Sequence, residues 1–186
     1  MNSKLRTEIR YVVGDATAPE GDGQKIIAHV CNDVGAWGAG FVLAMSKRWP
    51  VVKEEYKSFM ASEDHPGRDE GRRGEVLGGV NCVNVSREIY VANMIAQHGV
   101  RYDKDGKPPI RYDALVSCLN RLTYLCGLLG ASVHMPRIGC GLAGGDWRIV
   151  SAIIESTLCD QGIPTTVYDL PGAEWDGKTQ ASESKP

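Results

Sequence analysis

The chain has 186 residues, 24% of them charged, and a formal net charge of -2 at pH 7. This length suits one domain with a single buried core, and the nearly neutral charge favours neither a nucleic-acid nor a membrane partner. No run approaches the roughly 18 apolar residues of a membrane span, and residues 1–15 lack the apolar core of a signal peptide, so we expect an intracellular, cytoplasmic protein.

The cysteines and histidines give no sign of a metal site. The four histidines are dispersed without the spacing of a zinc motif, and the six cysteines form no CxxC pair. Several cysteines lie inside apolar periodic runs, which favours buried free thiols over disulfides or a zinc site. We therefore expect neither a metal nor an organic cofactor.

The first elements are two strands, each followed by a loop that is a candidate for ligand binding. Residues 8–13 read as a strand that stops at the sequence GDAT, residues 14–17. The continuous apolar run at 25–31 predicts a strand covered by helices on both faces. It leads into a glycine-rich loop at 32–41.

Helices and a hairpin occupy the middle of the chain. A short helix is expected at 41–49, and Pro50 fits the first turn of the next helix. The mixed-charge segment 62–73 reads as an exposed loop. Two strands follow, at about 75–84 and 88–95.

A strand, a glycine loop and a helix follow one another in the second half. After a polar, turn-rich segment at 98–111, a helix is expected at 112–129, ended by Gly130. Residues 131–147 then run from a short apolar strand through a loop with four glycines into a helix expected at 147–160. Such an arrangement places bare backbone N–H groups and the positive end of a helix against a phosphate. A phosphate-bearing ligand is therefore the leading hypothesis.

The order of the elements places the chain in the α/β class. A closing strand is expected at 165–170, so residues 1–170 form one domain and 171–186 read as a disordered, solvated tail. Strands alternate with helices over most of the length, which predicts a mostly parallel sheet between layers of helices. Antiparallel pairing is expected within the 75–95 hairpin.

Three loops at strand ends predict one shared site. The loops at 14–17, 32–41 and 137–146 all follow carboxyl ends of expected strands, where ligands collect in sheets of this kind. The sequence GCGLAG at 139–144 also matches the dinucleotide-binding fingerprint GxGxxG. That motif normally opens a domain of several further βα units, whereas here one helix and one strand follow.

Single residues in these loops leave alternatives open. Asp15 could cap a turn or accept a hydrogen bond from an exocyclic amine such as that of adenine, and Asp146 suits a helix N-cap more than a catalyst. His29 could be a core residue or lie near the ligand. Cys140 has little support as a nucleophile. Trp37, between glycines, suits packing against a sugar.

Three motifs together resemble a known family. GDAT at 14–17, HVCNDVGAWGAGF at 29–41 and MPRIGCGLAGG at 135–145 are similar to the motifs of the macrodomains, the ADP-ribose-binding fold. The spacing of the second motif, with RWPVVKEEY after it, looks most like the yeast-type ADP-ribose-1''-phosphate phosphatases. The PRIGCGL loop also resembles the terminal ADP-ribose glycohydrolases. The resemblance implies a three-layer α/β/α macrodomain with a central mixed, mostly parallel sheet.

The resemblance also implies roles for particular residues. Asp15 and the Ala16 amide would recognise adenine, Asn32 would bind the distal ribose, and His29 would be the acid/base or terminal-phosphate contact. The loop that wraps the distal ribose would supply Gly35, Ala36, Trp37, Gly38, Ala39 and Gly40. The loop that cradles the diphosphate would supply Arg137, Ile138, Gly139, Cys140, Gly141, Leu142, Ala143 and Gly144.

The sequence departs from the glycohydrolase pattern at two positions. The family lysine just beyond the strand at 88–95 is replaced by Ala96, Gln97 and His98, and Ala143 stands where an aspartate follows GCGL. A mechanism through a lysine–sugar bond therefore loses both chemical groups. Asp146 lies near the second position and is kept as a candidate catalytic residue.

The resemblance implies a hydrolase acting on ADP-ribose derivatives, with ADP-ribose-1''-phosphate as the first substrate to test. Water would attack at the distal end, oriented by Asn32 while His29 assists proton transfer. The alternatives are removal of ADP-ribose or an acetyl group from the distal ribose, and a non-catalytic reader of ADP-ribosylated proteins. No membrane or nucleic-acid partner is expected.

Overall fold

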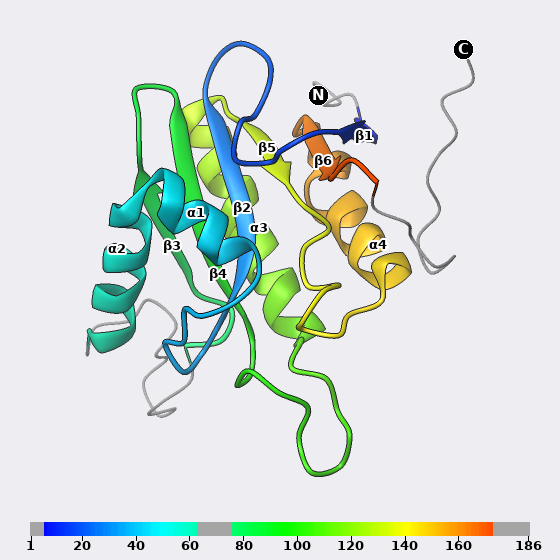
Figure 1. Cartoon of the computed structure of the whole chain (residues 1–186). Helices are drawn as coiled ribbons and strands as arrows, with labels where there is room; N and C mark the ends of the chain where they lie inside the picture. Colours follow the sequence, from blue (N-terminus) through cyan, green and yellow to red (C-terminus); the bar gives the residue numbers. More distant parts are fainter. Residues whose placement is uncertain (1–5, 63–75, 173–186) are drawn as a thin grey trace.

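A computed structural model describes residues 6–62 and 76–172. Six strands form one sheet in the order β1-β6-β5-β2-β4-β3 (Figure 1). Neighbouring strands run parallel except at one edge, where β3 pairs antiparallel with β4. The strands are β1 (Ile9–Val13), β2 (Lys25–Asn32), β3 (Val80–Asn84), β4 (Ile89–Gln97), β5 (Ser132–Met135) and β6 (Thr165–Asp169).

Helices cover both faces of the sheet. They are α1 (Phe41–Arg48), α2 (Pro50–Ala61), α3 (Tyr112–Leu129) and α4 (Trp147–Thr157), with a short 3-10 helix η1 (Cys159–Gln161) after α4. One buried cluster joins the sheet to α3 and α4, and a second joins its other face to α1 and α2. The predicted α/β class, with a mixed and mostly parallel sheet between helix layers, is confirmed.

Local signals in the sequence place several element boundaries. Pro50 occupies the first turn of α2, and Gly130 ends α3 in the left-handed conformation, with its amide donating to the Cys126 carbonyl. Seven of the eight residues of β2 are buried. Its continuous apolar run therefore reflects a strand covered on both faces, as predicted.

Two expected boundaries differ from the structure by three residues or more. The strand expected from residue 75 begins at Val80, because Val76 to Gly79 form a turn in which the Gly79 amide donates to the Val76 carbonyl. The helix expected to reach 160 ends at Thr157, and η1 follows until Gly162 adopts the left-handed conformation. Most of the loop expected at 62–73 and most of the tail expected at 171–186 lie outside the described residues.

The parallel strands bring the glycine loops to one edge of the sheet. Because β1, β2 and β5 run in the same direction, the segments that follow their carboxyl ends lie at a common edge. The 98–111 segment also lies there, joined to β4 by a bridge between Gln97 and Ile110. The convergence predicted for the three loops is therefore present.

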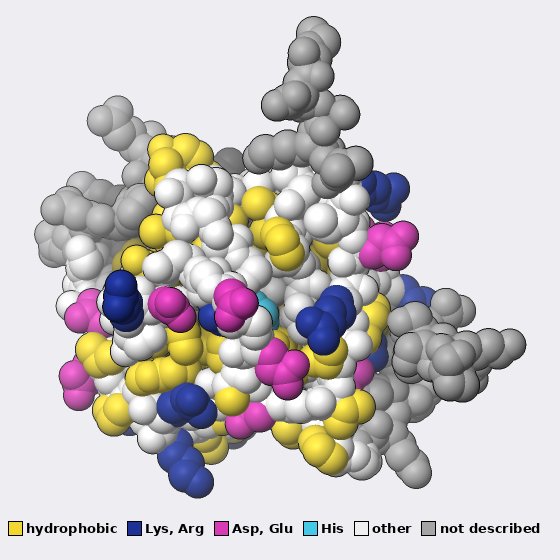
Figure 2. Space-filling model, turned by 90° about the horizontal axis from the view of Figure 1, so that it is seen from above, with side chains coloured by type: hydrophobic (Ala, Val, Ile, Leu, Met, Phe, Trp, Pro, Cys, Tyr) yellow, Lys and Arg dark blue, Asp and Glu magenta, His cyan; other side chains and the backbone are white. Residues whose placement is uncertain are grey.

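The distribution of surface charge and the apolar length of the helices are relevant to nucleic-acid and membrane partners. On the face seen in Figure 2, basic and acidic side chains are interspersed rather than gathered by sign. No helix within 6–62 and 76–172 is long and apolar enough to cross a membrane.

Candidate active site

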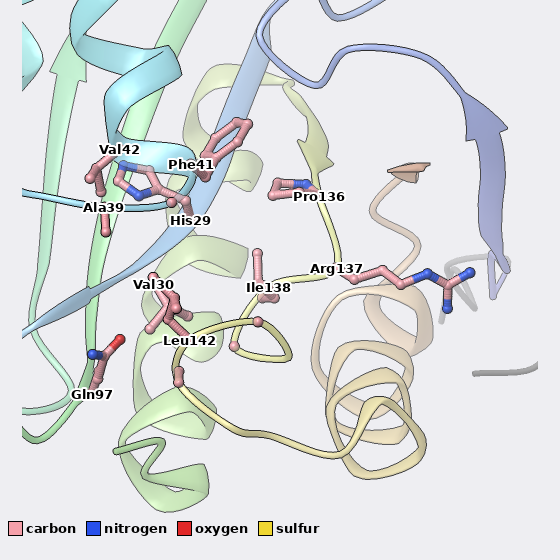
Figure 3. A pocket seen from close by; sticks show the side chains of 14 residues that line it. His29, Val30, Ala39, Phe41, Val42, Gln97, Pro136, Arg137, Ile138 and Leu142 are labelled. Atoms are coloured by element: carbon pink, nitrogen blue, oxygen red, sulfur yellow. The ribbon is translucent and has the colours of Figure 1, made fainter. Parts of the chain in front are cut away.

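A cleft opens between the two glycine loops at the carboxyl edge of the sheet. It consists of two adjoining cavities of about 260 and 280 Å³. The first lies against His29 and the 136–143 loop (Figure 3), and the second against Asn32 and the 36–39 turn. Both cavities are lined by Val30, Ala39, Val42, Gln97 and Leu142.

The side chain of Asn32 folds the first loop upon itself. Its Oδ1 accepts hydrogen bonds from the amides of Val34 (3.1 Å) and Ala36 (2.8 Å), and its Nδ2 donates to the Ala36 carbonyl (2.7 Å). The Tyr56 hydroxyl also lies 3.2 Å from Oδ1. Asn32 thus lines the cleft, but its side-chain amide is bonded to the loop that it shapes.

The second loop presents backbone amides to the cleft. Its turns are closed by the Cys140, Gly144 and Gly145 amides, which donate to carbonyls of the same loop. Within the described residues, no acceptor is bonded to the amides of Gly139, Gly141, Leu142 and Ala143. Adjacent unbonded amides of this kind form a concave anion-binding surface without any cationic side chain.

The N-terminus of α1 faces the same cleft. Gly40 is its N-cap and carries no side chain that could bond the first-turn amides, while Gly40, Phe41 and Val42 line the first cavity. The amides of Phe41 and Val42 have no partner among the described residues. The positive end of the helix dipole adds to the attraction for an anion.

His29 is a buried, neutral imidazole at the back of the first cavity. Its Nε2 donates to Asn93 Oδ1 (2.6 Å), because the Asn93 amide nitrogen already donates to Asn81 Oδ1. Its Nδ1 lies 3.7 Å from Cys31 Sγ. Burial lowers the pKa of His29 to about 4. The ring therefore lines the first cavity, but both nitrogens are engaged with protein groups.

Arg137 points away from the cleft despite its place in the predicted diphosphate loop. Figure 3 shows its side chain directed away from the other labelled residues. Its guanidinium forms a bidentate ion pair with Asp169, at 2.7 and 2.8 Å, and stacks on Tyr11 and Trp147 at about 5 Å. Its contribution to the cleft is its backbone.

Trp37 corrects a prediction. The sequence predicts an aromatic ring partly exposed to a sugar, but only 8% of Trp37 is exposed. Its ring packs edge-on against His29 and at 5.1 Å from the Tyr56 ring, within the buried cluster under α1 and α2.

The remaining candidates divide between the turn after β1 and the second loop. Asp15 is exposed and accepts a hydrogen bond from the Thr17 amide (2.8 Å), while Ala16 is buried, and neither lines the two cavities. Burial raises the pKa of the Cys140 thiol to about 12, so a thiolate nucleophile is disfavoured. Asp146 caps α4, accepting from the Arg148 amide.

Several lining residues were absent from the sequence-based list. Gln97 lies just beyond the strand predicted at 88–95, in the region where the glycohydrolases have a lysine. That position was the sequence signal that could have identified Gln97 as a site residue. Val30 and Phe41 stand inside the HVCNDVGAWGAGF motif at 29–41, which was a signal for them, whereas Val42 reads as an ordinary helix residue. Within 6–62 and 76–172, no cluster of three or more His, Cys, Asp or Glu side chains is arranged to hold a metal ion.

Comparison with solved structures defines the family. No protein-family model matches the chain. A protein of unknown function from Bacteroides thetaiotaomicron is 50% identical, with a TM-score of 0.81 over 88% of this chain and 98% of that chain. A macrodomain protein from Streptomyces coelicolor is 47% identical, with a TM-score of 0.71 over 87% and 99% of the two chains. The chain therefore belongs to the macrodomain family.

Curated relatives differ in size and in the activity they are named for. The mouse chromodomain-helicase-DNA-binding protein 1-like is 31% identical over 96% of this chain, which spans only 19% of that protein. An ADP-ribose 1''-phosphate phosphatase of Meyerozyma guilliermondii is 24% identical over 80% of this chain and 93% of its own length. A human ADP-ribose glycohydrolase is 29% identical over 88% and 93%.

Proposed function

We propose that the cleft binds ADP-ribose or a derivative of it, with the diphosphate held by backbone amides. The observation that carries this proposal is the meeting of unbonded amides from 139–143 with the uncapped start of α1 across one cleft. Such donors stabilise an anion without requiring a lysine or arginine in the site. Asp15 would bind the adenine amine from the turn after β1.

We further propose that the protein hydrolyses an ADP-ribose derivative, and that ADP-ribose-1''-phosphate is the substrate. The support is the motif from His29 to Phe41 and the similarity to relatives named for this activity, at 24% and 28% identity. Asn32 and His29 would act by shaping the loop and the wall of the cleft, since both side chains are engaged with protein groups.

A reader function is the second candidate, and the state of His29 favours it. An imidazole whose pKa is lowered to about 4 and whose nitrogens are both engaged is a poor general acid or base at neutral pH. A cleft that holds the diphosphate by backbone amides would bind ADP-ribose on a protein without turning it over. De-ADP-ribosylation, supported by the 29% identical glycohydrolase, is the third outcome to be measured.

Phosphorus NMR of ADP-ribose-1''-phosphate mixed with the protein tests these proposals. Loss of the terminal phosphate resonance with growth of inorganic phosphate supports the phosphatase. Shifted diphosphate signals without turnover support binding and reject the phosphatase, and a glutamate-ADP-ribosylated peptide then separates a reader from a glycohydrolase.

Variants test the binding mode. Asp15→Ala should weaken ADP-ribose binding, whereas Asp22→Ala, an exposed aspartate before β2, serves as the matched control. Unchanged diphosphate signals in the wild type would refute the cleft assignment.

A further inference from the structure

Gln97 occupies the junction of the two cavities. It lines both of them, and the four other residues that do so, Val30, Ala39, Val42 and Leu142, carry apolar side chains. Gln97 is half-buried at the last position of β4, between β2 and the edge strand β3. The middle of the cleft therefore has one polar side chain among its shared walls.

A strand irregularity brings Gln97 to this position. Cys31 pairs with Ile95 in the parallel ladder, but Asn32 pairs with Gln97, so Ala96 is an extra residue in β4. A bulge of this kind interrupts the regular alternation of side chains and re-aims the residue beside it.

The hydrogen bonds of Gln97 fix which way its carboxamide faces. Its Nε2 donates to the Gly99 carbonyl at 3.0 Å, and because a carbonyl can only accept, the assignment of nitrogen and oxygen follows. Figure 3 shows the oxygen on the side of Val30. No donor within residues 6–62 and 76–172 is bonded to Oε1. Asn32 and His29, the other neutral polar side chains of the cleft, already bond protein groups.

We propose that Gln97 is a positioning residue that orients the attacking water through Oε1, an inference that rests on the hydrolysis proposed above. The water oxygen bonds to phosphorus while the bond from phosphorus to the C1'' oxygen breaks, and its electron pair stays on that oxygen. One water proton passes through a phosphate oxygen to the leaving oxygen, which yields ADP-ribose and inorganic phosphate. The other O–H of the water donates to Oε1, so the amide is not protonated.

Two substitutions separate orientation of water from support of the loop. Gln97→Met keeps the length of the side chain and removes both polar atoms, while Gln97→Glu restores an acceptor but not the donor to Gly99. Gln24→Met is the matched control, since Gln24 lies before β2 and lines a separate cavity. Phosphate release is measured for each protein, and ADP-ribose affinity by calorimetry.

We expect Gln97→Met to lower kcat by about 10²-fold, the scale of a misplaced reactant, with KM changed by less than about twofold. Gln97→Glu should recover about tenfold of that loss, with a rate that rises with pH as the new carboxyl ionises. Gln24→Met should match the wild type.

Two results would overturn the role of Gln97 alone. One is a Gln97→Met enzyme that keeps wild-type kcat. The other is an equal loss in the Met and Glu variants with a parallel change in KM, because both lack the bond to Gly99. If the wild type binds ADP-ribose but releases no phosphate, the proposed hydrolysis and this role fail together, and the binding proposal survives.

Discussion

Two strand–loop–helix units meet at the cleft, and their helices begin differently. The β2 unit leads through its glycine loop into α1, whose N-cap is Gly40 with no capping side chain. The β5 unit leads into α4, whose N-cap Asp146 accepts from the Arg148 amide and forms an ion pair with the Arg148 guanidinium at 2.6 Å. The first turn of α4 is capped by its own carboxylate, whereas the first amides of α1 have no partner among the described residues.

Under the proposed function, two loops of one sheet edge share the binding of the anion. The β5 loop contributes amides from its interior, at 139–143, and closes its helix with a carboxylate. The β2 loop contributes a helix terminus. The proposed diphosphate site therefore uses the interior of the 137–144 loop, as expected from the sequence, together with the start of α1 instead of the start of α4.

The largest expected effect comes from making α1 resemble α4. Gly40→Asp places a carboxylate on the first-turn amides, where it competes with the diphosphate and repels it by about 4 kcal/mol, so ADP-ribose affinity should fall about 10³-fold by calorimetry. Gly40→Ala is the control, because it shares the strain of φ 78° without the charge. Equal losses in the two variants would show that the helix terminus does not bind the anion.

The histidines of the two units predict a dependence on pH. The pKa of His29 in β2 and of His134 in β5 is lowered to about 4, in both cases chiefly by burial. The unfolded chain, with an ordinary histidine pKa of about 6.5, binds protons more readily between these values. The contribution of each neutral histidine to the free energy of unfolding is therefore fully present above pH 6.5. It is lost as the pH decreases towards 4, and the loss is about 3 kcal/mol for His29.

Urea unfolding across this pH range and histidine NMR test the histidine effect. The imidazole resonance of His29 should remain that of a neutral ring at pH 5.5. In His29→Gln, the fall in stability with acid should be smaller than in the wild type. A His29 resonance that titrates near 6.5 would contradict the buried, neutral ring.

The interior of the β5 loop should tolerate substitution unevenly. A Cβ at Gly145 would meet the Gly139 carbonyl oxygen at 2.6 Å, so Gly145→Ala should cost about 2 kcal/mol of unfolding free energy through overpacking. A Cβ at Gly141 would meet nothing within 4 Å, which makes Gly141→Ala the matched control in urea unfolding. Similar losses of unfolding free energy at both positions would mean that the close contact between residue 145 and the Gly139 carbonyl is not what limits substitution in this loop.

The smallest expected effect comes from removing the cap of α4. Asp146→Ala should lower stability by about 1 kcal/mol and leave ADP-ribose affinity and turnover near wild type, because the carboxylate serves its own helix. Asp146→Ser should restore most of the stability. A loss of about 10²-fold in turnover in both variants would instead make Asp146 a catalytic residue.

The sequence by itself determined most of the helices and strands and several of their boundaries. Apolar runs gave the strands, Pro50 and Gly130 marked the ends of helices to the residue, and the glycines marked the loops at strand ends. These signals are local, since backbone conformation depends on neighbouring residues and on the few that tolerate or forbid particular φ values. With parallel strands, they also implied a shared edge.

Only the tertiary structure decided what each side chain in the cleft is bonded to. His29 meets Asn93, 64 residues away, and Arg137 meets Asp169, 32 residues away. Gln97 reaches the junction of the cavities through a register shift against β2. Such contacts depend on which distant segments of the chain become neighbours in the fold. The hydrophobic pattern of a short stretch of sequence does not contain that information.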